Sequence, residues 1–383
     1  MELKANSNKT AILYIDKNGN EQYLCPYFMV KALIKKIPAD CEPEELELYF
    51  RDVNLEGSFR IPLNILHDIK MFQQVCTKNY FIYAPFAAQI IQTEVHRQLK
   101  ATINANKVRY ENKCIGWVKF KGQDVFLTDS GTLPDGSNYT CIRDMGAWYR
   151  GSESDYDDML NDYVFNNPKL SLAYVLGFSG VLVARITDLR DLGVLLAGIS
   201  GQSTTGKTTA IKLIASIWAN PNNVQGRIIM RADCSNIGFN AQFAGFNGVS
   251  IIFDDVDQNN SLDLANQLNR LSNGTQRVVC DVNGDPKFNR MGFGGICIFA
   301  SECPLLEKTR KESGLYPRFL DLQDIVWTID AKSAEEIKRI CSQNFGFKGK
   351  TFAKFIEWMS TDDICKVFDE SYDFINQRIT TKD

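Results

Sequence analysis

The pattern of hydrophobic and polar residues divides the chain at about residue 110. Before that point, two short apolar runs, 11–15 and 22–25, flank Asn18-Gly19, a dipeptide typical of a β-hairpin turn. Further runs have the spacing of strands at 46–50 and 58–61, and the spacing of helices at 65–75 and 87–103. We therefore expect residues 1–110 to form a small α+β domain, and the sequence points to no chemistry in it.

A second region, residues 111–190, joins this domain to the rest of the chain. Its first part, 115–128, predicts another hairpin. The segment 129–165 is rich in Gly, Ser, Asp and Asn and poor in aliphatic residues, so we interpret it as a loop or linker. A weaker alternative is a carboxylate metal site formed by Asp155, Asp157, Asp158 and Asp162. A helix is expected over 170–185.

Strand-like and helix-like runs alternate from residue 194 to about 325, and such alternation indicates a three-layer α/β domain. We place this core at residues 191–330. Residues 332–378 have helical spacing throughout, which predicts a small helical lid at 331–383. The predicted fold is therefore an α/β core with a helical lid, preceded by the small α+β domain.

Composition narrows the class of protein. The chain has 383 residues, a net charge of −3 and a hydrophobic content of 44%, as in an ordinary globular protein. This charge argues against a protein that coats nucleic acid non-specifically, although it allows a motor that grips DNA inside a ring. No apolar run approaches the roughly 20 residues of a membrane span, and the N-terminus lacks an apolar signal core. We expect a cytoplasmic protein with no membrane partner.

The most informative motif lies at residues 201–208, where Gly-Gln-Ser-Thr-Thr-Gly-Lys-Thr matches the phosphate-binding pattern G-x-x-x-x-G-K-[ST]. A strand-like run at 194–200 precedes it and a helical run at 209–218 follows it, as the motif requires. Backbone N–H groups and the helix N-terminus favour phosphate binding here. Lys207 would reach the β- and γ-phosphates of ATP, and the Thr208 hydroxyl would coordinate Mg²⁺. The expected nucleotide-binding residues are Gly201, Gln202, Ser203, Thr204, Thr205, Gly206, Lys207, Thr208 and Thr209.

A second motif is the apolar run at 249–253, which ends in Asp254 and Asp255. A strand buried on both faces is a near-continuous apolar run, and acids at its carboxyl end project into a ligand site at that edge of the sheet. We expect Asp254 to hold Mg²⁺, directly or through water, and Asp255 to orient the attacking water. Nucleotide-hydrolysing proteins often carry Glu at the second position, so the shorter Asp255 also allows slow hydrolysis.

Two further features fit a ring motor. Short runs flank Asn283-Gly284, which predicts a hairpin inserted before the core strand at 295–300. This hairpin is either a pore loop, in which Lys287 meets a phosphate backbone, or a surface hairpin without a ligand. The core strand ends in Ser301, which we expect beside the Asp254 strand as a polar sensor of the γ-phosphate. Arg318 begins an apolar strand, where it forms either an arginine finger toward a neighbouring subunit or a structural salt bridge.

Taken in order, these motifs make residues 115–325 resemble the helicase-like AAA+ ATPases of mobile genetic elements, which are similar to superfamily III and MCM-like helicases. The resemblance rests on Gly116-Trp117 and on the segments 201–210, 216–218, 251–255, 273–277, 300–302 and 316–321. It implies a P-loop AAA+ three-layer core, a homo-oligomeric, hexameric ring, ATP hydrolysis between subunits and a hairpin that contacts DNA in the central channel.

The sequence thus predicts an ATP-hydrolysing ring motor that acts on DNA, a helicase or translocase, in the replication of a phage, plasmid or cassette element. Two other interpretations remain open. One is a regulatory or defence ATPase in which nucleotide-driven oligomerisation acts as a switch without unwinding. The other is a scaffold that binds nucleotide to fix its shape. Unwinding of a forked duplex distinguishes the motor from both.

Overall fold

The computed structural model describes two compact units, one of residues 1–112 with 131–140 and one of residues 113–130 with 141–383. The described residues are 2–37, 44–142, 148–190, 192–222, 228–232, 238–239, 242, 244–256, 264–272, 279–280, 286–287, 293–308 and 319–378.

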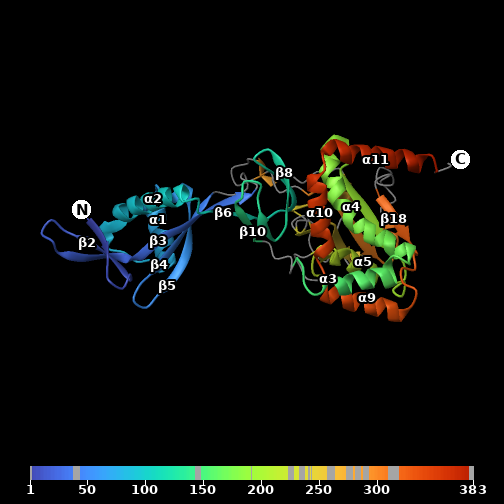
Figure 1. The fold of residues 1–383 in the computed structure, drawn as a ribbon, viewed down its shortest axis with the longest axis horizontal. Helices are drawn as coiled ribbons and strands as arrows, with labels where there is room; N and C mark the ends of the chain where they lie inside the picture. Colours follow the sequence, from blue (N-terminus) through green and yellow to red (C-terminus); the bar gives the residue numbers. More distant parts are fainter. Residues whose placement is uncertain are drawn as a thin grey trace. The chain divides into compact units, whose positions relative to one another are not determined.

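The first unit is a sheet with two longer helices, α1 and α2, and it matches the expected α+β class (Figure 1). Its sheet has the order β1-β2-β3-β6-β10-β9, and β4 pairs with both β3 and β5. The strands are β1 Glu2–Ala5, β2 Ala11–Ile15, β3 Glu21–Ile37, β4 Glu45–Arg51, β5 Glu56–Pro62, β6 Val108–Asn112, β9 Ser130–Thr132 and β10 Asn138–Cys141. The helices are α1 Ile69–Lys78 and α2 Ala88–Asn104, with short 3₁₀ turns at Leu63–Ile65 and Pro85–Ala87.

The predicted hairpin at Asn18-Gly19 is confirmed, because β2 and β3 pair antiparallel from Ile15 and Glu21 onward. The predicted strands and helices of this unit are also present. Alternate residues of β4, such as Leu46 and Leu48, are buried in the core beneath α2. The strand β6, which pairs parallel to the end of β3, was not predicted.

The second unit begins with the predicted hairpin, β7 Ile115–Phe120 and β8 Gln123–Leu127, which pair antiparallel. The short strand β13 Phe246–Asn247 adds to it in parallel. Gly116 explains the Gly-Trp pair of the sequence: its φ is +106°, and an added Cβ would lie 1.7 Å from the Asn247 carbonyl oxygen. The following Trp117 is buried, and its Nε1 donates to the Val181 carbonyl at 2.9 Å. The pair therefore fixes the hairpin to the rest of the unit.

The prediction of a loop or linker at 129–165 is wrong for much of that segment. It contains β9 and β10 of the first unit, and then α3 Glu153–Met159 and a π-helical turn at Leu160–Val164. Ser152 caps α3 by accepting from the Asp155 N–H. The buried side of this helical stretch carries Tyr156, Met159, Leu160 and Val164. The acids that suggested a linker occupy the polar side of a helix, and Asp157 forms an ion pair with Lys348.

The weaker alternative, a metal site at these acids, is also wrong. Within the described ranges, no group of three or more His, Cys, Asp or Glu side chains gathers to hold a metal ion.

The core of the second unit is a parallel sheet of order β12-β14-β17-β11-β18. Its strands are β11 Val194–Ser200, β12 Ile229–Arg231, β14 Ile251–Asp254, β17 Gly295–Ser301 and β18 Phe319–Gln323. Every residue of β17 is buried, as expected for a strand covered on both faces. A separate antiparallel pair joins β15 Val279–Cys280 to β16 Pro286–Lys287. The mixed α/β class with a parallel sheet is therefore confirmed.

Helices cover this sheet and extend beyond it to the C-terminus (Figure 1). They are α3, α4 Pro168–Arg190, α5 Lys207–Ser216, α7 Leu264–Ser272, α8 Leu305–Lys308, α9 Ala331–Gln343, α10 Phe347–Trp358 and α11 Thr361–Asn376. The helical character predicted for 332–378 is confirmed. Asp330 and Ser333 form a capping box at the start of α9, and Ser360 caps α11.

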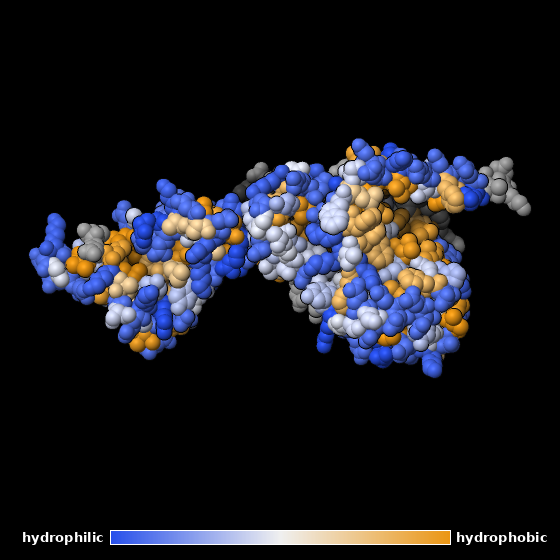
Figure 2. All heavy atoms as spheres, viewed as in Figure 1, coloured by the Kyte–Doolittle hydropathy of each residue, from blue (hydrophilic) through white to orange (hydrophobic). Residues whose placement is uncertain are grey.

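The long helix α4 corrects one expectation from composition. Its residues Pro168–Thr187 are long and apolar enough to cross a membrane by length and composition alone, with 44% of the most apolar window buried. The helix is apolar because it lies at the centre of the unit, where it packs against β11, β17, α5, α10 and α11. An outer stripe that includes Leu172 and Val175 is exposed, and Figure 2 shows apolar side chains gathered there.

Candidate functional site

The topology of the parallel sheet brings the ends of its strands together at one edge. Ser200, the last residue of β11, pairs in register with Ser301 of β17 and with Gln323 of β18. On the other side of β17 lies β14, which ends in Asp254, and Asp254 pairs with Arg231 of β12. The prediction that the Ser301 strand neighbours the Asp254 strand is confirmed. Ligands of open parallel sheets bind outside this carboxyl edge.

The glycine-rich segment 201–206 crosses this edge and leads directly into α5. Gly206 precedes the helix at its N-cap position with φ +83°. Lys207, the first helical residue, turns back over the loop and donates to the carbonyl oxygens of Gly201 and Gln202, the latter at 2.9 Å. The Thr205 hydroxyl also donates to the Gln202 carbonyl, at 2.8 Å. The loop is thus closed around the lysine ammonium, and the positive end of the α5 dipole faces it.

The remaining predicted loop residues differ in exposure. Gln202, Ser203, Thr204 and Thr208 are exposed, so their side chains are accessible to a ligand. Thr209 is buried, and its backbone N–H donates to the Gly206 carbonyl at 3.0 Å. Its side chain therefore faces the protein interior.

The segment 324–328, which is distant in sequence, packs against the loop and donates backbone hydrogen bonds to it and to the end of β11. The Trp327 N–H donates to the Thr205 carbonyl at 2.8 Å, and the Asp324 N–H donates to the Ser200 carbonyl at 3.0 Å. A Cβ built on Gly206 would lie 2.6 Å from the Thr328 hydroxyl oxygen. Sequence reasoning missed these contacts, because no local pattern in 324–328 marks a backbone that packs against another loop. They connect the glycine-rich loop to the residues that lead into α9.

The acidic pair lies beside the loop. Burial raises the pKa of Asp254 above its ordinary value, and the neighbouring Asp255 raises it further, while Arg231 and Lys207 act in the opposite direction. The Asp255 N–H donates to Asp254 Oδ1 at 3.1 Å, and Asp255 itself is exposed with φ +54°. Asp254 and Lys207 are therefore close enough to influence each other electrostatically. Arg231, which sequence reasoning missed, belongs to the same charge cluster.

The end of β17 carries Ser301, and Glu302 follows it. The Ser301 hydroxyl is buried and donates to the Cys303 carbonyl at 2.7 Å. Its neighbour Glu302 is the residue whose side chain reaches the loop, by accepting a hydrogen bond from the Ser203 hydroxyl at 2.9 Å. The sequence predicted Ser301 at the edge of the sheet, but it did not show that Glu302 contacts the loop.

These residues fit a magnesium nucleotide. The loop presents backbone N–H groups, a lysine and a helix N-terminus to an anion. The buried Ser200 hydroxyl has no hydrogen-bond partner among the described residues, directly below the loop. Mg²⁺ takes one or two carboxylates in addition to substrate phosphates, so Asp254 with the Thr208 hydroxyl is a sufficient protein contribution. A bound cation would also relieve the burial of the Asp254 charge.

Several predicted residues are not tested by this geometry. Asn283, Gly284 and Arg318 lie outside the described residues. Lys287 lies on β16, in register with Val279 of β15. The antiparallel pairing of these strands confirms a hairpin before β17, whereas a role in nucleic-acid binding stays a prediction.

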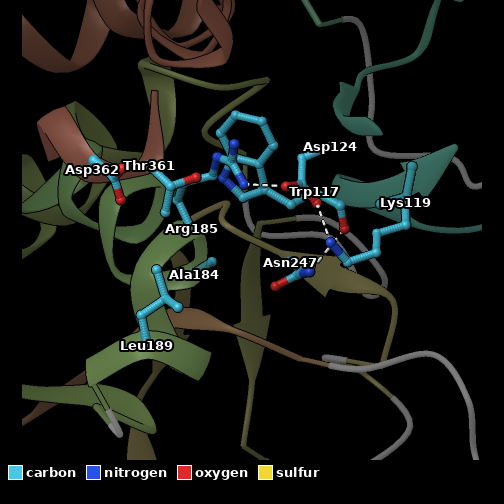
Figure 3. Close-up of a pocket in the computed structure, with 10 residues that line it drawn as sticks. Trp117, Lys119, Asp124, Ala184, Arg185, Leu189, Asn247, Thr361 and Asp362 are labelled. Carbon is cyan, nitrogen blue, oxygen red and sulfur yellow. Dashed lines mark hydrogen bonds and ion pairs between the residues drawn. The ribbon is translucent and has the colours of Figure 1, made fainter. Parts of the chain in front are cut away.

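A cavity of about 430 Å³ lies elsewhere in the second unit, between the β7–β8 hairpin, α4 and α11. Figure 3 shows Arg185 beside the ring of Trp117 and paired with Asp124, which also binds Lys119. Burial raises the pKa of Asp124, but the hydrogen bonds from Lys119 and Arg185 outweigh it and lower the pKa overall. The cavity also contains Asn247, which bridges to Gly294 just before β17, so it lies at the amino edge of the sheet. This cavity is therefore separate from the candidate nucleotide site, which lies at the carboxyl edge of the sheet.

Comparison with known proteins gives a family and a fold. A family model described as "Domain of unknown function (DUF927)" matches residues 88–290. No curated protein matches the sequence. A solved structure titled "SCCmec type IV Cch - active helicase" has a TM-score of 0.73 to this chain and 17% sequence identity, over 99% of this chain and 69% of the other. At this identity the likeness shows that the two chains share a fold.

Proposed function

The chain belongs to the DUF927 family, whose defining domain has no known function, and on this premise we propose that the protein is an ATP-hydrolysing motor acting on DNA. The observation that carries the proposal is the position of the 201–208 motif at the junction of β11 and α5, with Asp254 and Asp255 at the same edge of the sheet. We assign a P-loop AAA+ core to residues 191–330 and a helical lid to 331–383. Residues 1–112 with 131–140 form a separate unit, and the remaining residues of 113–190 lead into the core.

The chemistry follows from the side chains at the loop. Lys207 exchanges its two carbonyl partners for the β- and γ-phosphates of ATP, which neutralises part of their charge. Thr208 and Asp254 hold Mg²⁺, which supplies further neutralisation of the phosphate oxygens. Asp255 is exposed beside Asp254 and orients the attacking water.

The DNA-related part of the proposal draws on the fold and on the sequence. The structural relative is titled an active helicase of an SCCmec element, so a helicase or translocase of a mobile element is the corresponding function for this chain. The β15–β16 hairpin lies just before β17 in the chain, and in a homo-oligomeric hexameric ring it would contribute Lys287 to the central channel. Arg318 would act on the nucleotide of the neighbouring subunit.

A regulatory or defence ATPase is the second candidate. The feature that favours it is Asp255, which is one methylene shorter than Glu and so reaches less far toward a water at the γ-phosphate. In that case nucleotide binding would drive assembly, and hydrolysis would be slow.

The proposal is tested by ATP hydrolysis and strand displacement. Lys207→Ala should lower ATP turnover by about 100-fold or more, since it removes the charge that faces the phosphates. Lys212→Ala, on the same helix but beyond its first turn, is the matched control and should retain turnover. Unwinding of a forked duplex by the parent supports the motor, whereas ATP-dependent assembly without unwinding supports the regulatory ATPase. Equal turnover by Lys207→Ala and the parent would show that the site is misassigned.

A further inference from the structure

The rim of the phosphate loop carries a carboxylate from a neighbouring strand. Glu302 follows the last residue of β17, and its Oε1 accepts from the Ser203 hydroxyl at 2.9 Å. Ser203 is the third residue of the loop, while Lys207 donates to the carbonyls of Gly201 and Gln202. The loop is therefore in contact with a cation that belongs to α5 and with an anion that follows β17.

Acidic residues gather in the sequence at the carboxyl ends of β14 and β17, the strands next to the loop. Asp254 ends the neighbouring strand β14 and Asp255 follows it, while Glu302 follows β17, which lies between β14 and β11. Arg231 and Lys207 are the cations that act on Asp254. Three carboxylates thus lie at the carboxyl ends of two adjacent strands, whereas the first two phosphates of a bound nucleotide would meet backbone N–H groups and Lys207.

We propose that Glu302 sets the preference of this loop between nucleoside diphosphates and triphosphates, an inference that rests on the proposed function. A diphosphate fills the loop and leaves the Ser203–Glu302 hydrogen bond in place. A γ-phosphate brings additional negative charge close to Glu302, so the carboxylate must leave Ser203, and the freed hydroxyl then donates to the phosphate. Glu302 acts here as a specificity residue that penalises the triphosphate.

The surroundings of Glu302 permit this exchange as a side-chain movement. Glu302 is exposed, so its carboxylate is accessible to water. The backbone around it is fixed, since Ser301 before it is buried and Leu305 and Leu306 of α8 after it are buried in the core. The charge of Glu302 can therefore respond to nucleotide without unfolding of β17 or α8.

The test compares affinities for ADP and for the non-hydrolysable imido analogue of ATP, each with Mg²⁺, by titration calorimetry on the full chain. Glu302→Gln keeps the size and an acceptor oxygen for Ser203 but removes the charge. We expect it to bind the ATP analogue about tenfold more tightly, with ADP affinity changed by less than about twofold. Glu307→Gln, an exposed acid on α8, is the matched control and should change neither.

The outcomes separate this inference from other roles. Ser203→Ala removes the hydrogen bond and keeps the charge, so it should not reproduce the gain in affinity for the ATP analogue. If both variants behave alike, or if both nucleotides change equally, Glu302 has only a structural role and the inference is wrong. If Glu302→Gln lowers ATP turnover without changing either affinity, Glu302 acts on the attacking water, and the inference is again wrong. If the parent binds neither nucleotide, the proposed function itself fails.

Discussion

At the scale of single residues, Asp254 is a carboxylate held in an unfavourable environment. Its pKa is raised by burial and by Asp255. An acid with a raised pKa in the folded state binds its proton more tightly there than in the unfolded chain. The free energy of unfolding therefore falls as the pH rises from the unfolded pKa, near the ordinary value of 3.8, through the raised folded pKa. At higher pH than this, the ionised carboxylate destabilises the nucleotide-free fold.

Asp254→Asn should therefore stabilise the nucleotide-free protein at neutral pH, because it removes the buried charge and keeps the shape. The difference in Tm between variant and parent should shrink as the pH falls from the folded pKa of Asp254 to its unfolded pKa. Thermal unfolding in the presence of a chelator, at several pH values, measures it. A stabilisation that does not depend on pH would mean that the charge of Asp254 is not its cause.

The two acids should differ in their effect on the reaction. Asp255→Asn should retain nucleotide binding and lower turnover by roughly 10²–10⁴-fold, the usual contribution of a group that positions or deprotonates water. Asp254→Asn should instead weaken the Mg²⁺-dependent part of nucleotide binding, since it removes a ligand of the metal. Magnesium titrations of ATP binding, together with steady-state hydrolysis, separate the two effects. Equal losses of Mg²⁺ affinity would contradict this division of roles.

The placement of Lys207, Thr208 and Asp254 at one edge of the sheet follows from the sequence, because each belongs to a motif with a fixed position relative to a strand. The contact of Glu302 with Ser203 does not follow from it, since those residues are far apart in the chain. The sequence also does not reveal that the Ser301 hydroxyl donates a hydrogen bond to the Cys303 carbonyl. Side-chain partners of this kind depend on the packing of loops rather than on any periodic pattern.

At the scale of elements, the junction of the glycine-rich loop with α5 depends on Gly206. Its φ of +83° disfavours any side chain, and Thr328 occupies the position that a Cβ would need. Gly122, in the β7–β8 turn, has φ +84° with open space around it, and so provides a control with the same backbone and no clash.

We expect Gly122→Ala to lower the free energy of unfolding by about 1 kcal/mol, the cost of the backbone conformation alone. Gly206→Ala should lower it by about 2–3 kcal/mol, because the contact with Thr328 adds to the backbone cost. Urea unfolding of both variants measures the difference. The added contact is not a clash if the two variants lose equal stability, or if removing the hydroxyl with Thr328→Ala recovers none of the loss.

The elements also show where sequence patterns fail. The strands β11, β14 and β17 were predictable, because burial on both faces leaves a continuous apolar run such as 296–300. The three-residue strand β12 was not predicted. The helix α3 was not recognised, because four acids on its polar side resembled the composition of a linker. Its buried residues have helical spacing, but the stretch is too short for that spacing to outweigh composition.

At the scale of the whole molecule, the proposed ring makes the activity of one subunit depend on its neighbour. Arg318→Ala should leave nucleotide binding intact and lower hydrolysis by about 10³-fold, because an arginine finger acts on the transition state across an interface. Mixing Arg318→Ala with Lys207→Ala subunits should restore part of the activity, since some interfaces then contain both residues. If mixed assemblies form and no activity returns, Arg318 does not act in trans.

Nucleic-acid binding by the β15–β16 hairpin is the last consequence of the ring. The net charge of −3 gives the chain no general affinity for DNA, so any binding must come from local cations that the ring repeats. Lys287→Ala should therefore weaken DNA binding and reduce the slope of log affinity against log salt by about 1 for each phosphate that the lysine neutralises, with little change in basal ATP hydrolysis. Lys17→Ala, beside the Asn18-Gly19 turn of the first unit, removes a lysine from a comparable hairpin and should leave the slope unchanged. An unaltered DNA affinity of Lys287→Ala across the salt titration would remove the pore-loop role and favour the regulatory ATPase.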